Sequence, residues 1–127
     1  MRVLYVEDHE DVRELIGELL VEEGLDVLAC ESGEAALAAF ESSGPFDFVL
    51  TDVSLPGVSG TDLARLLLAR EPGLWVVFAS GYVMPISAAT WGPRVRALLK
   101  PFEAEQLRVY DHHGEDERPD VDAGTTP

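Results

Sequence analysis

Four apolar runs in this chain each end in polar residues, and this placement constrains the fold more than any other feature. The runs cover residues 3–6, 46–50, 74–79 and 95–99 and are rich in Val, Leu or Phe. Each run is continuous rather than alternating, and helical patterns separate the runs from one another. This arrangement is typical of strands that are buried on both faces of a parallel sheet.

Helical patterns occupy the stretches between the runs. Apolar residues from Val12 to Leu20 recur at helical spacing and stop near Gly24, and residues 25–30 form a further apolar run. Other helical patterns follow Ser32, follow the loop at residues 52–60, occupy residues 86–91 and run from residue 103 to about 110. The alternation predicts a single-domain α/β protein with a doubly wound, five-stranded parallel sheet and helices on both faces.

Size and composition indicate one cytoplasmic domain. With 127 residues, 46% of them hydrophobic, the chain is long enough to bury a core without disulfides. The single cysteine, Cys30, cannot form an internal disulfide, which fits a reducing compartment. The first apolar run is too short for a signal peptide and no run reaches bilayer length, so we expect a soluble, cytoplasmic protein without membrane contact.

The charge pattern argues against nucleic acid as a direct partner. The net charge is −15, and the nine basic residues are scattered singly, whereas binding to a phosphate backbone needs clustered Lys and Arg. Six of the 24 acidic residues lie in residues 111–127, a polar stretch without apolar periodicity. We therefore expect a folded domain over residues 1–110 and an acidic disordered tail over residues 111–127.

The polar residues that end the strands are expected to meet. Glu7 and Asp8 follow the first run, Asp52 the second, Ser80 the third and Lys100 the fourth. In a doubly wound sheet, ligands bind outside the carboxyl ends of the strands, so these side chains would share one edge. Crowded carboxylates repel one another unless a cation intervenes, and an open cluster of two or three acids suits Mg²⁺.

The same edge offers a nucleophile and groups that bind phosphate oxygens. Lys100 is the only lysine in the chain, placed where a compact point charge is useful, and Ser80 adds a hydroxyl. Together with a metal ion, they would bind a transferring phosphoryl group, whose transfer depends mostly on positioning and charge stabilisation. Asp52 is then the predicted nucleophile, because a carboxylate that attacks phosphorus forms an acyl phosphate.

These residues carry a family resemblance. The segments Val3–Asp8, Leu50–Gly60, Ser80–Gly81 and Lys100–Phe102 resemble the receiver domain of two-component response regulators, which has a flavodoxin-like fold. The resemblance implies that Asp52 is the phosphoacceptor and that Glu7, Asp8, Asp52 and the backbone carbonyl of Ser54 hold Mg²⁺. It also implies that Ser80 and Lys100 sense the phosphoryl group and that the Lys100–Pro101 bond is cis.

One position departs from the family pattern. Receivers usually carry Tyr or Phe three residues before the lysine, and here Ala97 stands there. The spacing from Ser80 to Lys100 is slightly short for the family, and the last helix is expected to be short as well. Either the switch works through the loop at residues 81–93 and the fourth helix, with Tyr82, or the output differs.

The resemblance implies a signalling role rather than turnover. The chain would take a phosphoryl group from a histidine kinase or a histidine phosphotransfer protein and then change its affinity for an unknown downstream protein. It would be a self-phosphorylating acceptor with slow autodephosphorylation, not a turnover enzyme. We expect it to act through protein contacts, either as a stand-alone receiver or as part of a larger kinase, and homodimer formation is left open.

Two other function classes compete with this interpretation. A magnesium phosphohydrolase that forms an aspartyl phosphate would need a second Asp two residues after the nucleophile, and Ser54 occupies that place. A phosphorylation-independent interaction domain is the second alternative, and Ala97 and the short final helix motivate it. Among the remaining residues, His9 is expected in an exposed loop, the pair at 112–113 is expected to be solvated, and Trp91 fits either core or a partner contact.

Overall fold

The structure, a computed structural model, describes residues 1–100, apart from the side chains of residues 88 and 89. The strands are β1 (Arg2–Val6), β2 (Asp26–Cys30), β3 (Phe48–Asp52), β4 (Trp75–Ser80) and β5 (Val95–Leu99). The helices are α1 (Glu10–Glu22), α2 (Gly33–Ser43), α3 (Gly60–Arg70) and α4 (Ala88–Trp91). The helix expected at 103–110, the tail expected at 111–127 and the Lys100–Pro101 bond lie outside the described residues.

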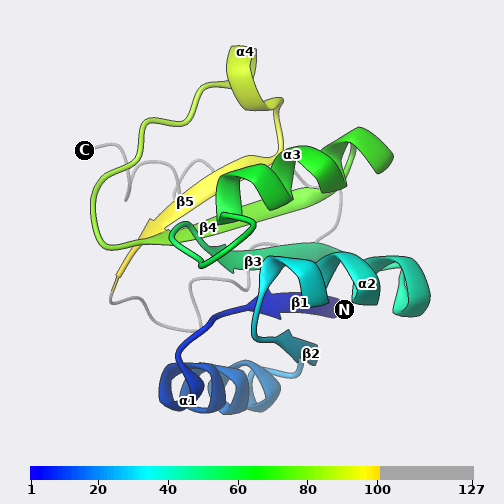
Figure 1. The fold of residues 1–127 in the computed structure, drawn as a ribbon, viewed down its shortest axis with the longest axis vertical. Coiled ribbons are helices and arrows are strands. Elements are labelled where there is room, and N and C mark those ends of the chain that lie inside the picture. Colours follow the sequence, from blue (N-terminus) through cyan, green and yellow to red (C-terminus); the bar gives the residue numbers. More distant parts are fainter. Residues whose placement is uncertain (101–127) are drawn as a thin grey trace.

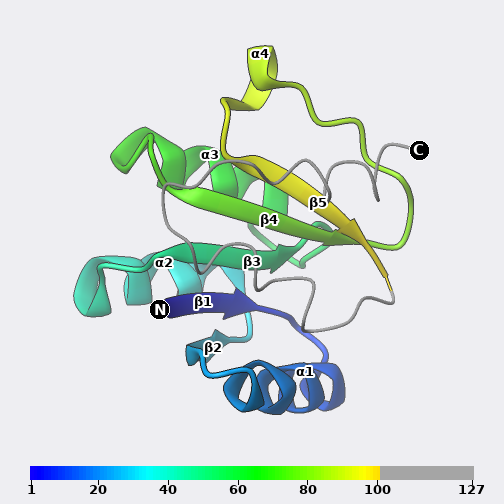
Figure 2. The same ribbon diagram turned by 180° about the vertical axis from the view of Figure 1, so that it is seen from behind.

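The strands form one five-stranded parallel sheet in the order β2-β1-β3-β4-β5. The arrowheads of β1, β3, β4 and β5 point to the same side in Figure 2. This order confirms the predicted doubly wound, flavodoxin-like fold. Chain order and spatial order diverge at β1, which lies between β2 and β3, so the topological switch point falls between β1 and β3.

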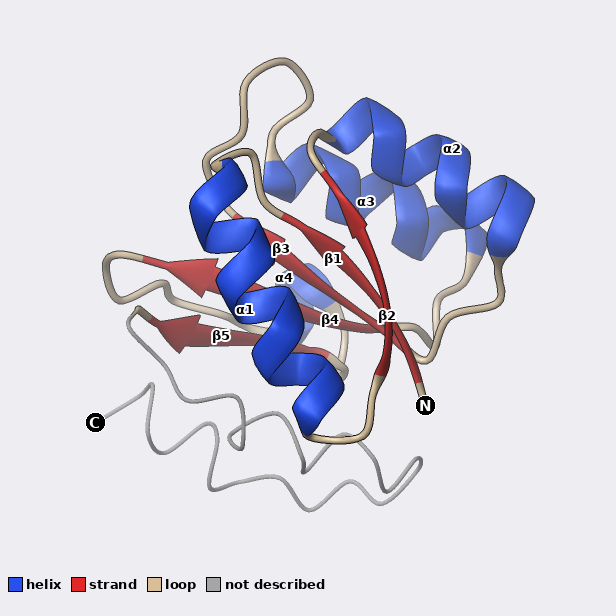
Figure 3. Cartoon of the chain, turned by 90° about the horizontal axis from the view of Figure 1, so that it is seen from below, coloured by secondary structure: helices blue, strands red, loops and turns tan. Residues whose placement is uncertain are grey.

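The two faces of the sheet have separate cores. One core joins β-strand residues such as Leu4, Val49 and Phe78 to α2 and α3, and the other joins Tyr5 and Leu50 to α1. Figures 1 and 3 show α2 and α3 on one side of the sheet and α1 on the other. Helices therefore cover both faces, as predicted, and β1, β3 and β4 are almost completely buried between them.

Local sequence explains where the helices begin and end. The Ser32 hydroxyl accepts a hydrogen bond from the backbone N–H of Ala35 (3.0 Å), which confirms its predicted role as the cap of α2. Ser59 caps α3 in the same way through the N–H of Asp62 (3.1 Å). Gly24 adopts φ 93° directly after the last turn of α1, a conformation that ends a helix at little cost for glycine.

Several boundaries differ from those predicted by one or two residues, and two elements begin two residues late. β3 begins at Phe48 rather than at residue 46, because the Phe46 ring stacks on Phe40 of α2 (centroids 6.1 Å apart) and is buried there instead of in the sheet. The fourth helix is one turn, Ala88–Trp91, shorter than the expected span from 86, and the Ser87 carbonyl accepts the first hydrogen bonds, from the N–H groups of Thr90 and Trp91. None of the helices in residues 1–100 is long and apolar enough to span a bilayer.

Candidate functional site

Four strand ends bring the predicted polar residues to one edge of the sheet. Asp52 is the last residue of β3 and Ser80 the last of β4, whereas Glu7 and Lys100 directly follow β1 and β5. Backbone hydrogen bonds extend the sheet past these ends. The N–H of Glu7 donates to the Cys30 carbonyl (3.0 Å), and the N–H of Lys100 donates to the Ser80 carbonyl (2.7 Å). The side chains are thus placed by the main chain of the sheet and not by a free loop.

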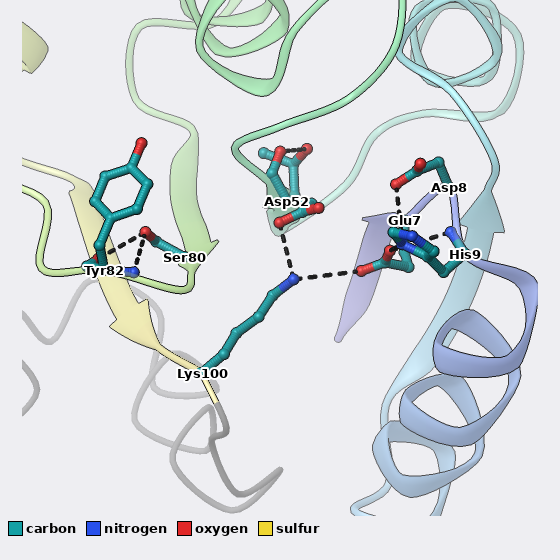
Figure 4. Close-up of polar contacts among 8 residues, drawn as sticks. Glu7, Asp8, His9, Asp52, Ser80, Tyr82 and Lys100 are labelled. Atoms are coloured by element: carbon teal, nitrogen blue, oxygen red, sulfur yellow. Dashed lines mark hydrogen bonds and ion pairs between the residues drawn. The ribbon is translucent and has the colours of Figure 1, made fainter.

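Lys100 links the two buried carboxylates. Its Nζ lies 2.9 Å from Oδ1 of Asp52 and 3.8 Å from Oε1 of Glu7, and the three side chains point toward one another in Figure 4. Asp52 and Glu7 are 8% and 2% exposed. Because a buried carboxylate without a partner is costly, the ammonium stabilises both groups.

Asp8 and His9 extend the acidic cluster on the side away from Lys100. Oδ1 of Asp8 is buried and accepts no hydrogen bond from the described residues. His9 Nδ1 lies 3.0 Å from Oε2 of Glu7 and 3.5 Å from Oδ1 of Asp8. The hydrogen bond with Glu7, and then the charge of Asp8, raise the pKa of His9 above its usual range. His9 is exposed as predicted, but its contact with both acids was not foreseen.

The hydroxyl of Ser80 is engaged with its own loop. Ser80 is 2% exposed, and its Oγ donates to the Tyr82 carbonyl (2.6 Å) and accepts from the Tyr82 N–H (3.1 Å). The Tyr82 side chain is exposed to solvent beside this turn. Ser80 therefore stands at the predicted edge, and its hydroxyl bonds the turn rather than Asp52.

The loop after β3 requires glycine at two positions. Gly57 adopts φ 73°, which side chains rarely allow. A Cβ at Gly60 would lie 2.0 Å from the carbonyl oxygen of Asp52, so only glycine lets α3 begin this close to Asp52. Ser54 is exposed in the same loop, and its carbonyl as a metal ligand stays a prediction.

A buried phenol lies beneath the acidic cluster. Tyr5 is 3% exposed in β1. Burial, together with the negative charges of Glu7 and Asp52, raises the pKa of Tyr5 well above its usual range. The phenol therefore stays neutral, and the acidic cluster gains no further negative charge from below.

The position that departs from the family pattern belongs to the core cluster on which Trp91 packs. Ala97 is buried and pairs across the sheet with Phe78. The Trp91 ring meets the Phe78 ring edge to face (centroids 5.3 Å, planes at 68°), and the Arg65 guanidinium stacks over Trp91 at 4.2 Å. Of the two roles expected for Trp91, core packing or a partner contact, the structure shows core packing: the half-buried ring packs on the core from α4. Its contact with Arg65 of α3 was not predicted from the sequence.

Comparison with known proteins supports one family. A family model described as "Response regulator receiver domain" matches residues 3–110. The sensory transduction protein RegX3 of Mycolicibacterium smegmatis is 47% identical over 107 residues, which cover 83% of this chain and 46% of that protein. The virulence sensor protein BvgS of Bordetella pertussis is 45% identical over 71 residues, or 56% of this chain and 6% of that protein. The chain thus spans about half, or less, of the length of these relatives.

Solved structures agree with the sequence relatives. The response regulator TrrA of Thermotoga maritima, in complex with Mg²⁺-BeF, has a TM-score of 0.73 at 29% identity over 87% of this chain and 96% of that chain. The receiver domain of the hybrid histidine kinase CckA has a TM-score of 0.70 at 32% identity over 88% and 96% of the two chains. With the family match over most of its length, this chain belongs to the response regulator receiver domain family.

Proposed function

We propose that this receiver domain accepts a phosphoryl group on Asp52 from a phosphohistidine, in a Mg²⁺-dependent reaction. In this step an Asp52 carboxylate oxygen bonds to phosphorus while the bond from phosphorus to the imidazole nitrogen breaks, so the donor histidine leaves neutral after taking up a proton. The donor would be a histidine kinase or a histidine phosphotransfer protein. The observation that carries the proposal is the Lys100 ammonium, 2.9 Å from the Asp52 carboxylate at the switch point of the sheet.

The donor set fits a hard divalent cation. Glu7, Asp8 and Asp52 offer carboxylate oxygens, with the Ser54 carbonyl as the further ligand, and oxygen donors are what Mg²⁺ prefers. The buried Oδ1 of Asp8, which has no hydrogen-bond donor among residues 1–100, supports this fit. When bound, Mg²⁺ would neutralise phosphoryl oxygens and hold them beside the acceptor.

Lys100 and Ser80 would bind the phosphoryl oxygens. The Lys100 ammonium already faces Asp52 and needs only a small movement to pair with the new anion. For Ser80 the hydroxyl must leave the Tyr82 backbone. Two neutral hydrogen bonds contribute about 0.5–1.5 kcal/mol each, and one bond to a charged acceptor about 1.5–3 kcal/mol. The exchange is close to balanced, which is the condition for a two-state switch that a phosphoryl group can tip.

The proposal also covers the partners of the domain and its location in the cell. A net charge of −15 without a basic cluster in the sequence supports protein partners rather than nucleic acid as direct contacts. One cysteine and the absence of a bilayer-length run in the sequence favour a cytoplasmic location. The downstream partner is a protein that distinguishes the turn with the Ser80 hydroxyl bonded to the Tyr82 backbone from the turn with that hydroxyl bonded to the phosphoryl group. Slow loss of the phosphoryl group returns the turn to its first position.

The test is the intact mass of the chain after incubation with phosphoramidate and Mg²⁺. Wild type should gain one phosphoryl group, and Asp52→Asn should gain none, because the amide is a poor nucleophile. Asp26→Asn is the matched control, since Asp26 is an exposed acid at the start of β2 and should leave the gain intact. A wild-type chain that stays unmodified, or an Asp52→Asn chain that is modified, contradicts the proposal.

One observation favours a second function, a receiver fold that binds its partner without phosphorylation. Ala97 is buried and lacks the aromatic ring by which family members report the phosphoryl group. Beryllofluoride with Mg²⁺ separates the two functions. Partner affinity that changes with beryllofluoride supports the switch, whereas equal affinity with and without it supports the constitutive interaction domain.

A further inference from the structure

We propose that His9 supplies an imidazole nitrogen to the metal centre at Glu7 and Asp8, so that the centre binds first-row transition ions and depends on His9 for doing so. The inference rests on the metal-binding role proposed above for the acidic pair. It goes beyond that role because it adds a nitrogen donor and a preference among metals. Imidazole suits ions such as Co²⁺, Ni²⁺ and Zn²⁺, whereas Mg²⁺ favours oxygen donors.

The first argument is the position of the imidazole. One donor atom each from Glu7, Asp8 and His9 lie within 4.8 Å of one another. His9 Nδ1 is 3.0 Å from Glu7 Oε2 and 3.5 Å from Asp8 Oδ1. Atoms that bind one ion at about 2.0–2.2 Å lie about 3–4 Å apart, so these donors could hold a shared ion after small side-chain movements.

The second argument is that the His9 side chain does nothing for the helix it precedes. His9 is the N-cap residue of α1, but its side chain makes no capping hydrogen bond. Its backbone N–H instead donates to Glu7 Oε2 (3.1 Å), which holds the residue over the acidic pair. The imidazole faces the carboxylates while its other edge is exposed, so an ion can reach it from solvent.

The third argument is that the two oxygens of Glu7 have different partners. Oε1 faces the Lys100 ammonium (3.8 Å), and Oε2 faces His9. The Lys100 side of the cluster is therefore already occupied by a positive charge. On the His9 side, Oδ1 of Asp8 makes no hydrogen bond within residues 1–100 and lies 3.5 Å from His9 Nδ1. The carboxylate oxygen of Asp8 and the imidazole nitrogen beside it thus point to a mixed oxygen and nitrogen site.

The experiment measures metal binding directly, with Co²⁺ alone and Mg²⁺ alone as probes. His9→Gln replaces the nitrogen donor by an amide oxygen at an exposed position and should not disturb the fold. Because the sequence contains three histidines, His112→Gln/His113→Gln is the control background, in which His9 is the single histidine left. Affinities come from calorimetry, and the visible absorption of bound Co²⁺ reports whether nitrogen is among its ligands.

In the control background, Co²⁺ should bind at the centre with an absorption spectrum typical of a nitrogen ligand. His9→Gln should weaken Co²⁺ binding about tenfold or more, by analogy with the loss of groups that support a metal site, and change that spectrum. Mg²⁺ affinity should stay within about twofold, because its oxygen ligands are untouched. A tighter affinity for Co²⁺ than for Mg²⁺ would not suffice alone, since oxygen sites share that order.

Three results would overturn the inference. They are an unchanged Co²⁺ affinity in His9→Gln, an equal loss of Co²⁺ and Mg²⁺ affinity, or a loss of Co²⁺ binding on replacing His112 and His113. The same preparations are tested for phosphoryl gain with phosphoramidate and Mg²⁺. Failure of wild type to gain a phosphoryl group contradicts the proposed function, and unchanged Co²⁺ binding in His9→Gln contradicts the imidazole donor alone.

Discussion

Two regions at the same edge of the sheet are held in different ways. The acceptor region, Glu7, Asp52 and Lys100, is held by ion pairs among largely buried groups that stand directly on strand ends. The readout region, Ser80, Tyr82, Trp91 and Ala97, is held by two neutral hydrogen bonds in a turn and by aromatic packing under a one-turn helix.

Under the proposed function, the acceptor region would serve phosphoryl transfer and the readout region the change in partner binding. Strand ends in a buried sheet leave little freedom, so the acceptor region can hold reacting groups at fixed distances. Turns and short helices open at lower free energy than core strands, so the readout region can change shape when one hydroxyl changes partner. The departure from the family pattern, Ala97, falls in the readout region, so under the proposed function other contacts in this region would have to report the phosphoryl group.

The largest expected effect is in the acceptor region. Lys100→Met removes the ammonium that faces Asp52, so the developing charge on the phosphoryl group loses a positioned cation. We expect phosphoryl transfer to slow by about a hundredfold, the order found when one charge-stabilising donor is removed. The rate of mass gain with phosphoramidate measures it. Arg70→Met, which breaks an exposed ion pair with Glu41 at the end of α3, should leave the rate unchanged. Equal rates for wild type and Lys100→Met would contradict the assigned role.

A pair of glycine substitutions tests how tightly the acceptor loop is packed. A Cβ at Gly60 would clash with the Asp52 carbonyl, so Gly60→Ala should lower the free energy of unfolding by about 1–3 kcal/mol. Gly17 in α1 has no heavy atom within 4 Å of an added Cβ, so Gly17→Ala should raise it by about 0.5–1 kcal/mol. Urea unfolding measures both. If Gly60→Ala and Gly17→Ala both raise the free energy of unfolding, α3 does not approach the Asp52 carbonyl as closely as described.

In the readout region, Ser80→Ala should loosen the turn without unfolding the domain. It removes both hydrogen bonds to Tyr82, worth about 0.5–1.5 kcal/mol each, so the Tyr82 amide should exchange its hydrogen several-fold faster. Hydrogen exchange at that amide is the measurement. Ser42→Ala is the control, because its hydroxyl bonds the Ala38 carbonyl within α2. Unchanged exchange in Ser80→Ala would show that the turn does not depend on the hydroxyl.

The smallest expected effect concerns the contact between α3 and α4. Arg65→Gln removes the guanidinium stacked on Trp91 and should cost about 0.5–1 kcal/mol at this partly exposed site. In a Trp75→Phe background, the emission of Trp91 should shift to longer wavelength as the ring becomes more hydrated. Arg94→Gln, whose guanidinium lies over Trp75, should leave that emission unchanged. A shift caused by Arg94→Gln but not by Arg65→Gln would contradict the stacking arrangement.

Much of this arrangement follows from particular residues in the sequence. The buried strands were predictable because short continuous apolar runs between helical patterns are typical of strands buried on both faces. Ser32 and Gly24 were predictable helix boundaries because a serine hydroxyl can cap a helix and glycine readily adopts a positive φ. The start of β3 was not, because Phe46 is as apolar as the strand it precedes and only its packing on Phe40 removes it from the sheet. Likewise, nothing in the spacing of Ser80 and Tyr82 indicated that the hydroxyl would bond the turn.

The sequence by itself determined which groups stand at the strand ends, since local periodicity and chain order place Glu7, Asp52, Ser80 and Lys100 one after another. Only the tertiary structure decided which of them touch. The order β2-β1-β3-β4-β5 makes β1 and β3 neighbours, and an ammonium from the far edge then reaches carboxylates on both. Such contacts join residues far apart in the chain, so the short-range sequence pattern does not determine them. The packing of the two cores against the sheet determines them.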